Sequence, residues 1–335
     1  MLRLPEFDYY APETLEGAVE LLRDHGPEAM VVAGGTDLFP KMKRRQMEPR
    51  VLVGLRRIRE LYGIREREGG GYLLGSMATL TQINETRRLR DYAALQDAAG
   101  SVSTPQLRNA GTIGGNLCVD TRCTYYDQTY HWRKSINFCL KKDGEICWVA
   151  PGSSRCWAVT SSDTAPVLIA LDAQVRLVGP RGERTVPVGG LYGSEGIDYL
   201  AGKRPDEILT EILLPEVENV RSVYIKVRRR GSFDFPILGV GATLQVSDDG
   251  TIQDARLVLG AVESFPLVIE EARELLIGNR LDEDLIEAVA QAAFKAARPL
   301  DNTDLTLYYR KKVVPVHVRR ALRQLAGAEE VERTA

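Results

Sequence analysis

The chain has 335 residues, a length at which about two domains are expected. With 44% hydrophobic and 27% charged residues, it has the composition of a folded globular protein and not of a disordered one. Its 44 basic and 46 acidic residues give a net charge of −2, which argues against nucleic acid as the main partner. No apolar run approaches the roughly 18 residues that span a bilayer, and the first ten residues lack the apolar stretch of a secretory signal. We therefore expect a cytoplasmic protein with no membrane or nucleic-acid partner.

The first 60 residues indicate a small α/β lobe. A helix is predicted over residues 12–26, with Thr14 as its N-cap and Gly26 at its end. Short apolar runs predict strands at residues 29–33 and 51–55. This order predicts a β–α–β-like opening.

The remainder alternates short strands and helices before ending in helices. The predicted elements are a strand at 72–76, a helix at 80–95 capped by Thr81, a helix and then a strand within 165–178, and strands at 222–230, 236–247 and 255–261. The second and third of those later strands are expected to pair across a turn at residues 248–250. Two amphipathic helices follow, with apolar faces formed by Ile286, Val289, Ala290 and Ala293, and by Val314, Val318, Ala321 and Leu325. The charged tail from Ala326 onward is expected to fray.

Cysteine and tryptophan are confined to one short segment. All five cysteines and all three tryptophans fall between residues 118 and 157: Cys118, Cys123, Cys139, Cys147, Cys156, Trp132, Trp148 and Trp157. Cytosolic thiols are kept reduced, so clustering favours a metal or redox centre over a disulfide framework. The last four cysteines lie 16, 8 and 9 positions apart, without the close pair typical of structural zinc sites. An iron–sulfur cluster tolerates such spacing best, while zinc and ordinary free thiols remain open alternatives.

Two glycine-rich loops offer backbone amides to a phosphate-rich ligand. Residues 34–37 (GGTD) follow a predicted strand directly, and residues 111–116 (GTIGGN) repeat the same chemistry. Neither loop matches the dinucleotide G-x-G-x-x-G pattern or carries a P-loop lysine. Each loop alone is also compatible with a simple turn.

With these loops, the sequence resembles the FAD-binding subunits of molybdenum hydroxylases, which include the flavin part of xanthine dehydrogenase and the medium subunit of CO dehydrogenase. The resemblance rests on motifs in the family's order: VVAGGTDL at 31–38, GSMAT at 75–79, GTIGGN at 111–116, SDTAP at 162–166, Tyr224-Ile225-Lys226 with Arg229, Arg230 and Asp234, and a C-terminal part with Asp301, Asn302, Tyr309 and Arg310. It implies an α+β fold, in which a two-lobed FAD-binding domain of the vanillyl-alcohol-oxidase (PCMH-like) type precedes a C-terminal α+β domain. The expected segments are 1–60 and 61–218 for FAD binding and 219–330 for the C-terminal domain.

One departure from the common family pattern is informative. Asn116 and Asp163 are 47 positions apart, an excess of about 40 residues over the short turn expected there, and the four widely spaced cysteines lie within it. Such an insertion, at about 118–158, resembles that of the β subunits of 4-hydroxybenzoyl-CoA reductases, where it carries a [4Fe–4S] cluster. The resemblance implies Cys123, Cys139, Cys147 and Cys156 as ligands and leaves out Cys118.

The resemblance also implies FAD contacts but no catalytic residue in this chain. The expected FAD-binding residues are Val32, Ala33, Gly34, Gly35, Thr36, Asp37, Leu38, Thr79, Ser103, Gly111, Thr112, Gly114, Gly115, Asn116, Asp163 and Lys226. Asp163 would accept a hydrogen bond from the flavin N3–H, and Lys226 would place positive charge near the ring. A helix N-cap is the alternative for Asp163, and a solvated surface lysine the alternative for Lys226. Tyr309 and Arg310 are expected to serve packing and surface rather than a site.

The implied function is electron transfer within a larger complex. Partner chains would hold [2Fe–2S] clusters and a molybdenum cofactor, with a heterotrimer doubled by symmetry to a heterohexamer. Reduced ferredoxin would supply electrons for the reductive dehydroxylation of 4-hydroxybenzoyl-CoA to benzoyl-CoA, an anaerobic reaction located on the molybdenum subunit. The alternatives are an FAD subunit of another molybdenum hydroxylase with a structural insertion, a zinc-stabilised interaction module and a free-standing flavin reductase.

Overall fold

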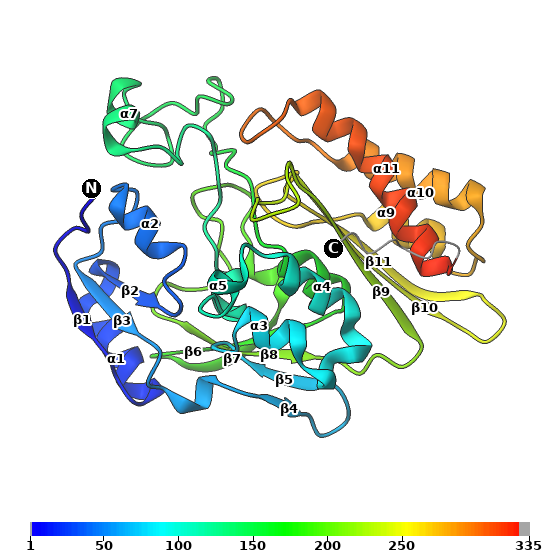
Figure 1. Cartoon of the computed structure of the whole chain (residues 1–335), viewed down its shortest axis with the longest axis horizontal. Helices are drawn as coiled ribbons and strands as arrows, with labels where there is room; N and C mark the ends of the chain where they lie inside the picture. Colours follow the sequence, from blue (N-terminus) through cyan, green and yellow to red (C-terminus); the bar gives the residue numbers. More distant parts are fainter. Residues whose placement is uncertain (1, 328–335) are drawn as a thin grey trace.

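Three β-sheets organise residues 2–327, the part of the chain that the computed structural model describes. Figure 1 shows them in chain order across the molecule, with the cysteine-rich segment as a separate lobe beside the N-terminal sheet. Most of the expected tail, residues 328–335, lies outside the described residues. Within them, no helix has both the length and the apolar character needed to cross a bilayer.

The N-terminal lobe is a three-stranded parallel sheet. Its strands, in sheet order, are β1 (Asp8–Tyr10), β3 (Val51–Gly54) and β2 (Ala29–Val32). The helix α1 (Leu15–His25) begins as predicted, because the Thr14 hydroxyl accepts a hydrogen bond from the Gly17 amide at 3.1 Å. The strands predicted at 29–33 and 51–55 are confirmed as β2 and β3, and the short helix α2 (Leu38–Lys43), which was not predicted, connects them.

The second sheet is antiparallel and five-stranded. In sheet order its strands are β4 (Ile64–Glu66), β5 (Tyr72–Gly75), β8 (Ile208–Leu214), β6 (Gln174–Gly179) and β7 (Gly182–Pro187). The helices that belong to this part are α3 (Leu80–Glu85), α4 (Ala93–Ser101), α5 (Pro105–Arg108), α6 (Ile113–Leu117) and α8 (Thr164–Ala170). The apolar faces of α3, α4, α6 and α8 form a large buried core with this sheet, and the predicted helix-then-strand at 165–178 is confirmed.

The single helix predicted over residues 80–95 is wrong. α3 is capped by Thr79, not Thr81, through a capping box in which Gln82 bonds back to the Thr79 amide at 2.9 Å. The chain then leaves the helix at Thr86, passes through a 3₁₀ segment at Arg87–Tyr92 and starts α4. The apolar spacing was compatible with one continuous helix because both pieces bury one face in the same core.

The C-terminal sheet is antiparallel, in the order β12 (Leu267–Val268), β11 (Ile252–Gly260), β10 (Leu238–Val246) and β9 (Val220–Val227). The helices α9 (Glu270–Leu276), α10 (Glu283–Ala296) and α11 (Leu307–Ala326) lie beside it (Figure 1). The predicted hairpin and both predicted apolar faces are confirmed, because all eight of those side chains are buried in this core.

The cysteine-rich segment leaves and rejoins the fold at one place. Arg122 and Val159 pair through two backbone hydrogen bonds of 2.8 and 2.7 Å, which close the base of the insertion. Inside it, the short helix α7 (Tyr130–Ser135) is capped by Thr129. Buried Arg133 donates from Nη2 to the carbonyl oxygens of Arg44, at 3.2 Å, and Arg45, at 2.7 Å, so the insertion is anchored just beyond α2.

Candidate functional site

The two glycine loops meet in the structure. A Cβ added at Gly34 would lie 2.0 Å from the carbonyl oxygen of Ala110, and one at Gly111 would lie 3.6 Å from Thr36 Oγ1. Residues 34–36 therefore pack directly on residues 110–111, and glycine at position 34 is required by this close approach. The expected phosphate loops form one continuous surface.

The two loops differ in how they use their amides. Within residues 2–327, none of the amides of Gly34 to Asp37 donates to another group of the chain, and Gly35 has a positive φ of 73°. A pyrophosphate accepts hydrogen bonds from adjacent N–H groups of this kind, which have no partner within the chain. In the second loop most amides already donate hydrogen bonds within the chain. The amides of Gly111, Ile113 and Gly114 donate to the carbonyl oxygens of Leu107, Ala78 and Ser76, and the Gly115 amide donates to the Thr112 hydroxyl. The first loop is thus the better equipped phosphate cradle.

The second loop holds neighbouring segments in place. Thr79 and Thr112 pair as an isolated bridge and cap α3 and α6. Asn116 Oδ1 accepts from Ser162 Oγ at 2.9 Å and from the Thr164 hydroxyl at 2.7 Å. Asn116 therefore attaches the second glycine loop to the segment that carries Asp163, across the whole length of the insertion.

Asp163 lies at the centre of a buried polar cluster. Its two carboxylate oxygens accept from Tyr224 Oη at 2.6 Å and from Lys226 Nζ at 2.8 Å, and Lys226 also donates to the Ser101 carbonyl at 3.0 Å. Burial raises the pKa of Asp163, and the charge and hydrogen bond of Lys226 oppose that shift. Asp163 occupies the N-cap position of α8 but makes no side-chain hydrogen bond to the helix, and the Lys226 side chain, 5% exposed, is not a solvated surface lysine.

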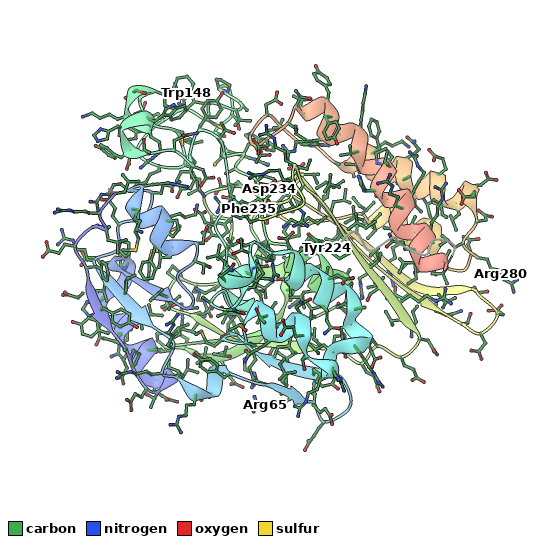
Figure 2. The ribbon with its side chains drawn as sticks, in the orientation of Figure 1. Arg65, Trp148, Tyr224, Asp234, Phe235 and Arg280 are labelled. Carbon is green, nitrogen blue, oxygen red and sulfur yellow. The ribbon has the colours of Figure 1, made fainter. Side chains whose placement is uncertain are left out.

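Sequence reasoning gave Tyr224 no role, although it lies on the same strand, β9, as Lys226. Residues two apart on a strand face the same side, so the period-2 alternation was the signal that could have found it. Tyr224 is buried, and Figure 2 shows it below Phe235, which lies in the β9–β10 connection. Ser103, another expected FAD residue, follows α4 with a φ of 50° near the Lys226 partner Ser101.

The four expected cluster ligands line one pocket. Cys123, Cys139, Cys147 and Cys156 are all buried and line one small pocket. The remaining wall comes from Tyr125, Tyr126, Leu140, Lys141, Trp148, Val149 and Ala158. Trp148 lies at the outer end of this lobe in Figure 2. Residues separated by up to 33 positions in sequence therefore converge at one place, which spacing alone did not establish.

The Cys156 sulfur accepts a hydrogen bond from the Ala158 amide at 3.4 Å. The backbone amides of Tyr125 and Tyr126 lower the pKa of Cys123, and those of Lys141 and Lys142 lower the pKa of Cys139. Burial nonetheless raises the pKa of Cys123 to about 12 and that of Cys156 to about 11. Buried thiolates need a positive centre to replace lost hydration, and N–H···S bonds prepare them for it. This donor set fits an iron–sulfur cluster.

The fifth cysteine lies elsewhere, and no single-ion site is formed. Cys118 follows α6, and its carbonyl oxygen accepts from Tyr199 Oη at 3.2 Å. All five cysteines are free thiols. In the described range, 2–327, no three His, Cys, Asp or Glu side chains are arranged to hold one metal ion.

Arg122 joins the glycine loop to the cysteine lobe. Its guanidinium bonds to Asp37 at 2.8 Å and to Asp127 at 3.2 Å, and Asp127 in turn accepts from the Cys123 amide at 3.1 Å. The ring of Phe235, from the C-terminal part, lies 3.5 Å from the guanidinium carbon. The partly buried guanidinium of Arg122 therefore contacts the first glycine loop, the cysteine lobe and the C-terminal part of the chain.

Arg310 has the structural role expected of it. It is fully buried and donates to the backbone of Leu300, Ala261 and Ile237 and to Asn302 Oδ1. Asn302 itself bonds to the Trp157 carbonyl at 2.6 Å, so this cluster supports the back of the cysteine lobe. Tyr309 is exposed.

Comparisons with known proteins agree with this architecture. Residues 5–217 match the model described as "FAD binding domain in molybdopterin dehydrogenase", and residues 222–325 match "CO dehydrogenase flavoprotein C-terminal domain". The chain is 28% identical over 316 residues to the nicotinate dehydrogenase FAD-subunit of Eubacterium barkeri, covering 93% of each. It is 30% identical over 302 residues to the aldehyde oxidoreductase FAD-binding subunit PaoB of Escherichia coli, covering 86% of this chain and 90% of that one. Among solved structures, a carbon monoxide dehydrogenase from Hydrogenophaga pseudoflava superposes with a TM-score of 0.80 at 26% identity, over 97% of this chain and 99% of the other.

Proposed function

Because the chain belongs to the family of FAD-binding subunits of molybdopterin dehydrogenases, we propose that it is the FAD- and [4Fe–4S]-containing electron-transfer subunit of a 4-hydroxybenzoyl-CoA reductase. The family assignment makes it an oxidoreductase subunit of the molybdenum hydroxylase type. The insertion supports the narrower proposal. A cluster beside the flavin is the feature that separates this reductase from an ordinary FAD subunit of the family.

The observation that carries the proposal is the convergence of four cysteines on one buried pocket. The insertion is closed at its base by the Arg122–Val159 pair, and its interior is organised around the sulfurs of Cys123, Cys139, Cys147 and Cys156. When bound, a [4Fe–4S] cluster would supply single-electron transfer.

FAD would be held by the surface that runs from the first glycine loop to Lys226. The free amides of residues 34–37 would bind the pyrophosphate, with Thr36 adding its hydroxyl. Residues Val32, Ala33, Leu38, Thr79, Ser103 and those at 111–116 would shape the surrounding surface. Each oxygen of Asp163 retains a lone pair beyond its bond to Tyr224 or Lys226, so the carboxylate can still accept from a flavin N–H. FAD would supply one- and two-electron exchange.

The same proposal names the partners. Further subunits of the complex would carry the [2Fe–2S] clusters and the molybdenum cofactor, and the substrate would react there. Reduced ferredoxin would be the electron donor, delivering electrons through this chain to those centres for removal of the ring hydroxyl from 4-hydroxybenzoyl-CoA. This inward direction rests on the cysteine lobe.

The test is to measure iron, acid-labile sulfide and flavin on the purified protein, prepared without oxygen, together with its EPR spectrum after dithionite reduction. We expect about four irons and four sulfides per flavin. A flavoprotein without iron would instead be an FAD subunit of another molybdenum hydroxylase, which the family assignment also accommodates. Zinc in place of iron would support a zinc-stabilised lobe.

Single cysteine variants sharpen this test. Cys139→Ser should abolish the cluster signal and leave FAD bound, because the pocket loses a ligand while the glycine loops are untouched. Cys118→Ser is the matched control, since Cys118 lies outside the pocket, and it should retain both groups. A full cluster signal in Cys139→Ser would refute the ligand assignment.

A further inference from the structure

A line of buried charges lies against the cysteine pocket. Asp120 pairs through one oxygen with Lys141 Nζ at 2.8 Å and through the other with Lys41 Nζ at 2.9 Å. The exposed fractions of the Lys41, Asp120 and Lys141 side chains are 2%, 3% and 7%. Charges this deeply buried interact more strongly with their neighbours than surface charges do, because little water screens them.

Lys141 is the member of this line that faces the sulfurs. It lines the pocket, and its positive charge acts on both Cys139 and Cys156. Its ammonium is fixed by the Thr121 hydroxyl at 2.8 Å and by the Gly196 carbonyl. Gly196 itself passes so close to the pocket that an added Cβ would lie 2.9 Å from Cys156 Sγ.

Lys141 is the lysine of this line that lies nearest the pocket. Lys41 pairs with Asp120 and also with Asp127 at 3.6 Å, whereas the ion pair of Lys141 is with Asp120, on the side of that carboxylate that faces the pocket. The rings of Tyr126 and Tyr199 lie 5.0 and 5.3 Å from its ammonium, a further arrangement that holds a cation in place. Asp120 partly offsets the charge of Lys141.

We propose that Lys141 is a positioning residue whose fixed charge sets the reduction potential of the group held by the four cysteines, with Asp120 moderating it. This inference rests on the proposed function, because it needs a redox group in the pocket. A fixed cation stabilises whichever oxidation state carries more negative charge, which is the reduced state, and so raises the potential. A higher reduction potential would favour transfer of electrons from the donor to the group in the pocket.

The experiment is an EPR-monitored redox titration of the intact protein and three variants. Lys141→Met should shift the reduction equilibrium at least tenfold toward the oxidised state, which is about 59 mV for a one-electron couple. Asp120→Asn should shift it in the opposite direction by a similar factor, because Lys141 then lacks the carboxylate that pairs with it, while Lys41 keeps Asp127. Lys142→Met is the matched control: its backbone amide also faces Cys139, but its side chain is one-third exposed and paired with Asp143 at 3.2 Å, so a change below threefold is expected.

Opposite shifts of the two buried-charge variants, with little change in the control, would support the role of Lys141. An unchanged midpoint in an iron-loaded Lys141→Met protein would overturn it and leave the proposed function intact. If that variant fails to load iron, Asp120→Asn decides alone, since an unchanged or lowered midpoint there also overturns the proposal. Absence of iron from the unmodified protein would instead refute the proposed function.

Discussion

The carboxylate of Asp163 depends on two side chains contributed by one strand. Burying an unpaired carboxylate costs several kcal/mol, and here the cost is offset by Lys226 at 2.8 Å and Tyr224 at 2.6 Å. The cluster lies between α8 and β9, so it also fixes the C-terminal sheet against the FAD-binding part. The Asp163–Lys226 ion pair therefore belongs to the candidate FAD site and also holds two parts of the fold together.

Replacing Lys226 with Met should destabilise the protein by about 3–5 kcal/mol, because the buried carboxylate keeps its desolvation cost and loses its counter-charge. The pKa of Asp163, already raised by burial, should rise further in this variant. Tyr224→Phe, which removes one hydrogen bond to a charged group, should cost only about 1.5–3 kcal/mol. Urea unfolding measures both values. Equal effects of the two variants would show that the Lys226 charge is not what balances Asp163.

Sequence reasoning identified Asp163 and Lys226 through a resemblance but did not predict that they pair. The two residues are 63 positions apart and lie on different elements, so their contact depends on how the sheets pack. The buried lysines at 41 and 141 had no signal at all, since a lysine in a loop or short helix is ordinarily solvated. Local patterns predict elements, whereas such pairs are set by tertiary structure.

At the scale of elements, the long C-terminal helices were predictable and the short ones were not. The apolar faces of α10 and α11 repeat with helical period over several turns and are buried as predicted. The 80–95 segment had comparable spacing, but the capping groups at Thr79 and Thr86 divide it. When two successive helices bury their apolar faces in the same core, the capping residues indicate where one helix ends and the next begins, and the apolar periodicity does not.

α11 also makes stability depend on pH. His317 lies partly buried in it, and burial, with a smaller contribution from Arg320, lowers the pKa of His317 from 6.5 to about 4. The folded protein thus binds this proton less readily than the unfolded chain. The stability that depends on neutral His317 is fully present above pH 6.5 and is lost as the pH falls from 6.5 toward 4. In His317→Gln, whose side chain does not titrate, the free energy of unfolding should fall less steeply over that range in denaturant titrations at pH 7, 6 and 5. If the free energy of unfolding falls equally with pH in both proteins, groups other than His317 cause the loss of stability in acid.

At the scale of the whole molecule, the cysteine lobe is attached to both other parts of the chain. Asp37 contacts Arg122 from the first glycine loop, 85 positions away in sequence, and Thr124 donates to the Asn302 carbonyl at 2.8 Å from the C-terminal side. The family resemblance predicted where the insertion begins and ends. It did not predict these attachments, because they form only when all three sheets are assembled. The proposed segment boundaries at 60 and 218 stay predictions.

Arg122 is the attachment whose removal should affect both cofactor sites at once. In Arg122→Gln, Asp37 and Asp127 lose their shared cation. We expect a loss of about 1–3 kcal/mol, since both carboxylates are partly exposed. Burial already raises the pKa of Asp37, against the charges of Lys41 and Arg122, so the variant should also hold the glycine loop less firmly and retain less FAD. Because Asp127 accepts from the Cys123 amide, iron content should fall together with flavin.

The control for Arg122 is Arg280→Gln, at the edge of the C-terminal part and far from Trp148 of the cysteine lobe (Figure 2), where Arg280 pairs with Asp249 at 3.6 Å on the surface. An exposed pair of this kind contributes about 0–1 kcal/mol, and its loss should leave flavin and iron unchanged. Flavin and iron are measured per chain after gel filtration of each variant. A decrease in FAD with full iron in Arg122→Gln would mean that the glycine loop and the cysteine lobe are held independently. A parallel decrease would mean that one guanidinium couples them, as its contacts with Asp37 and Asp127 imply.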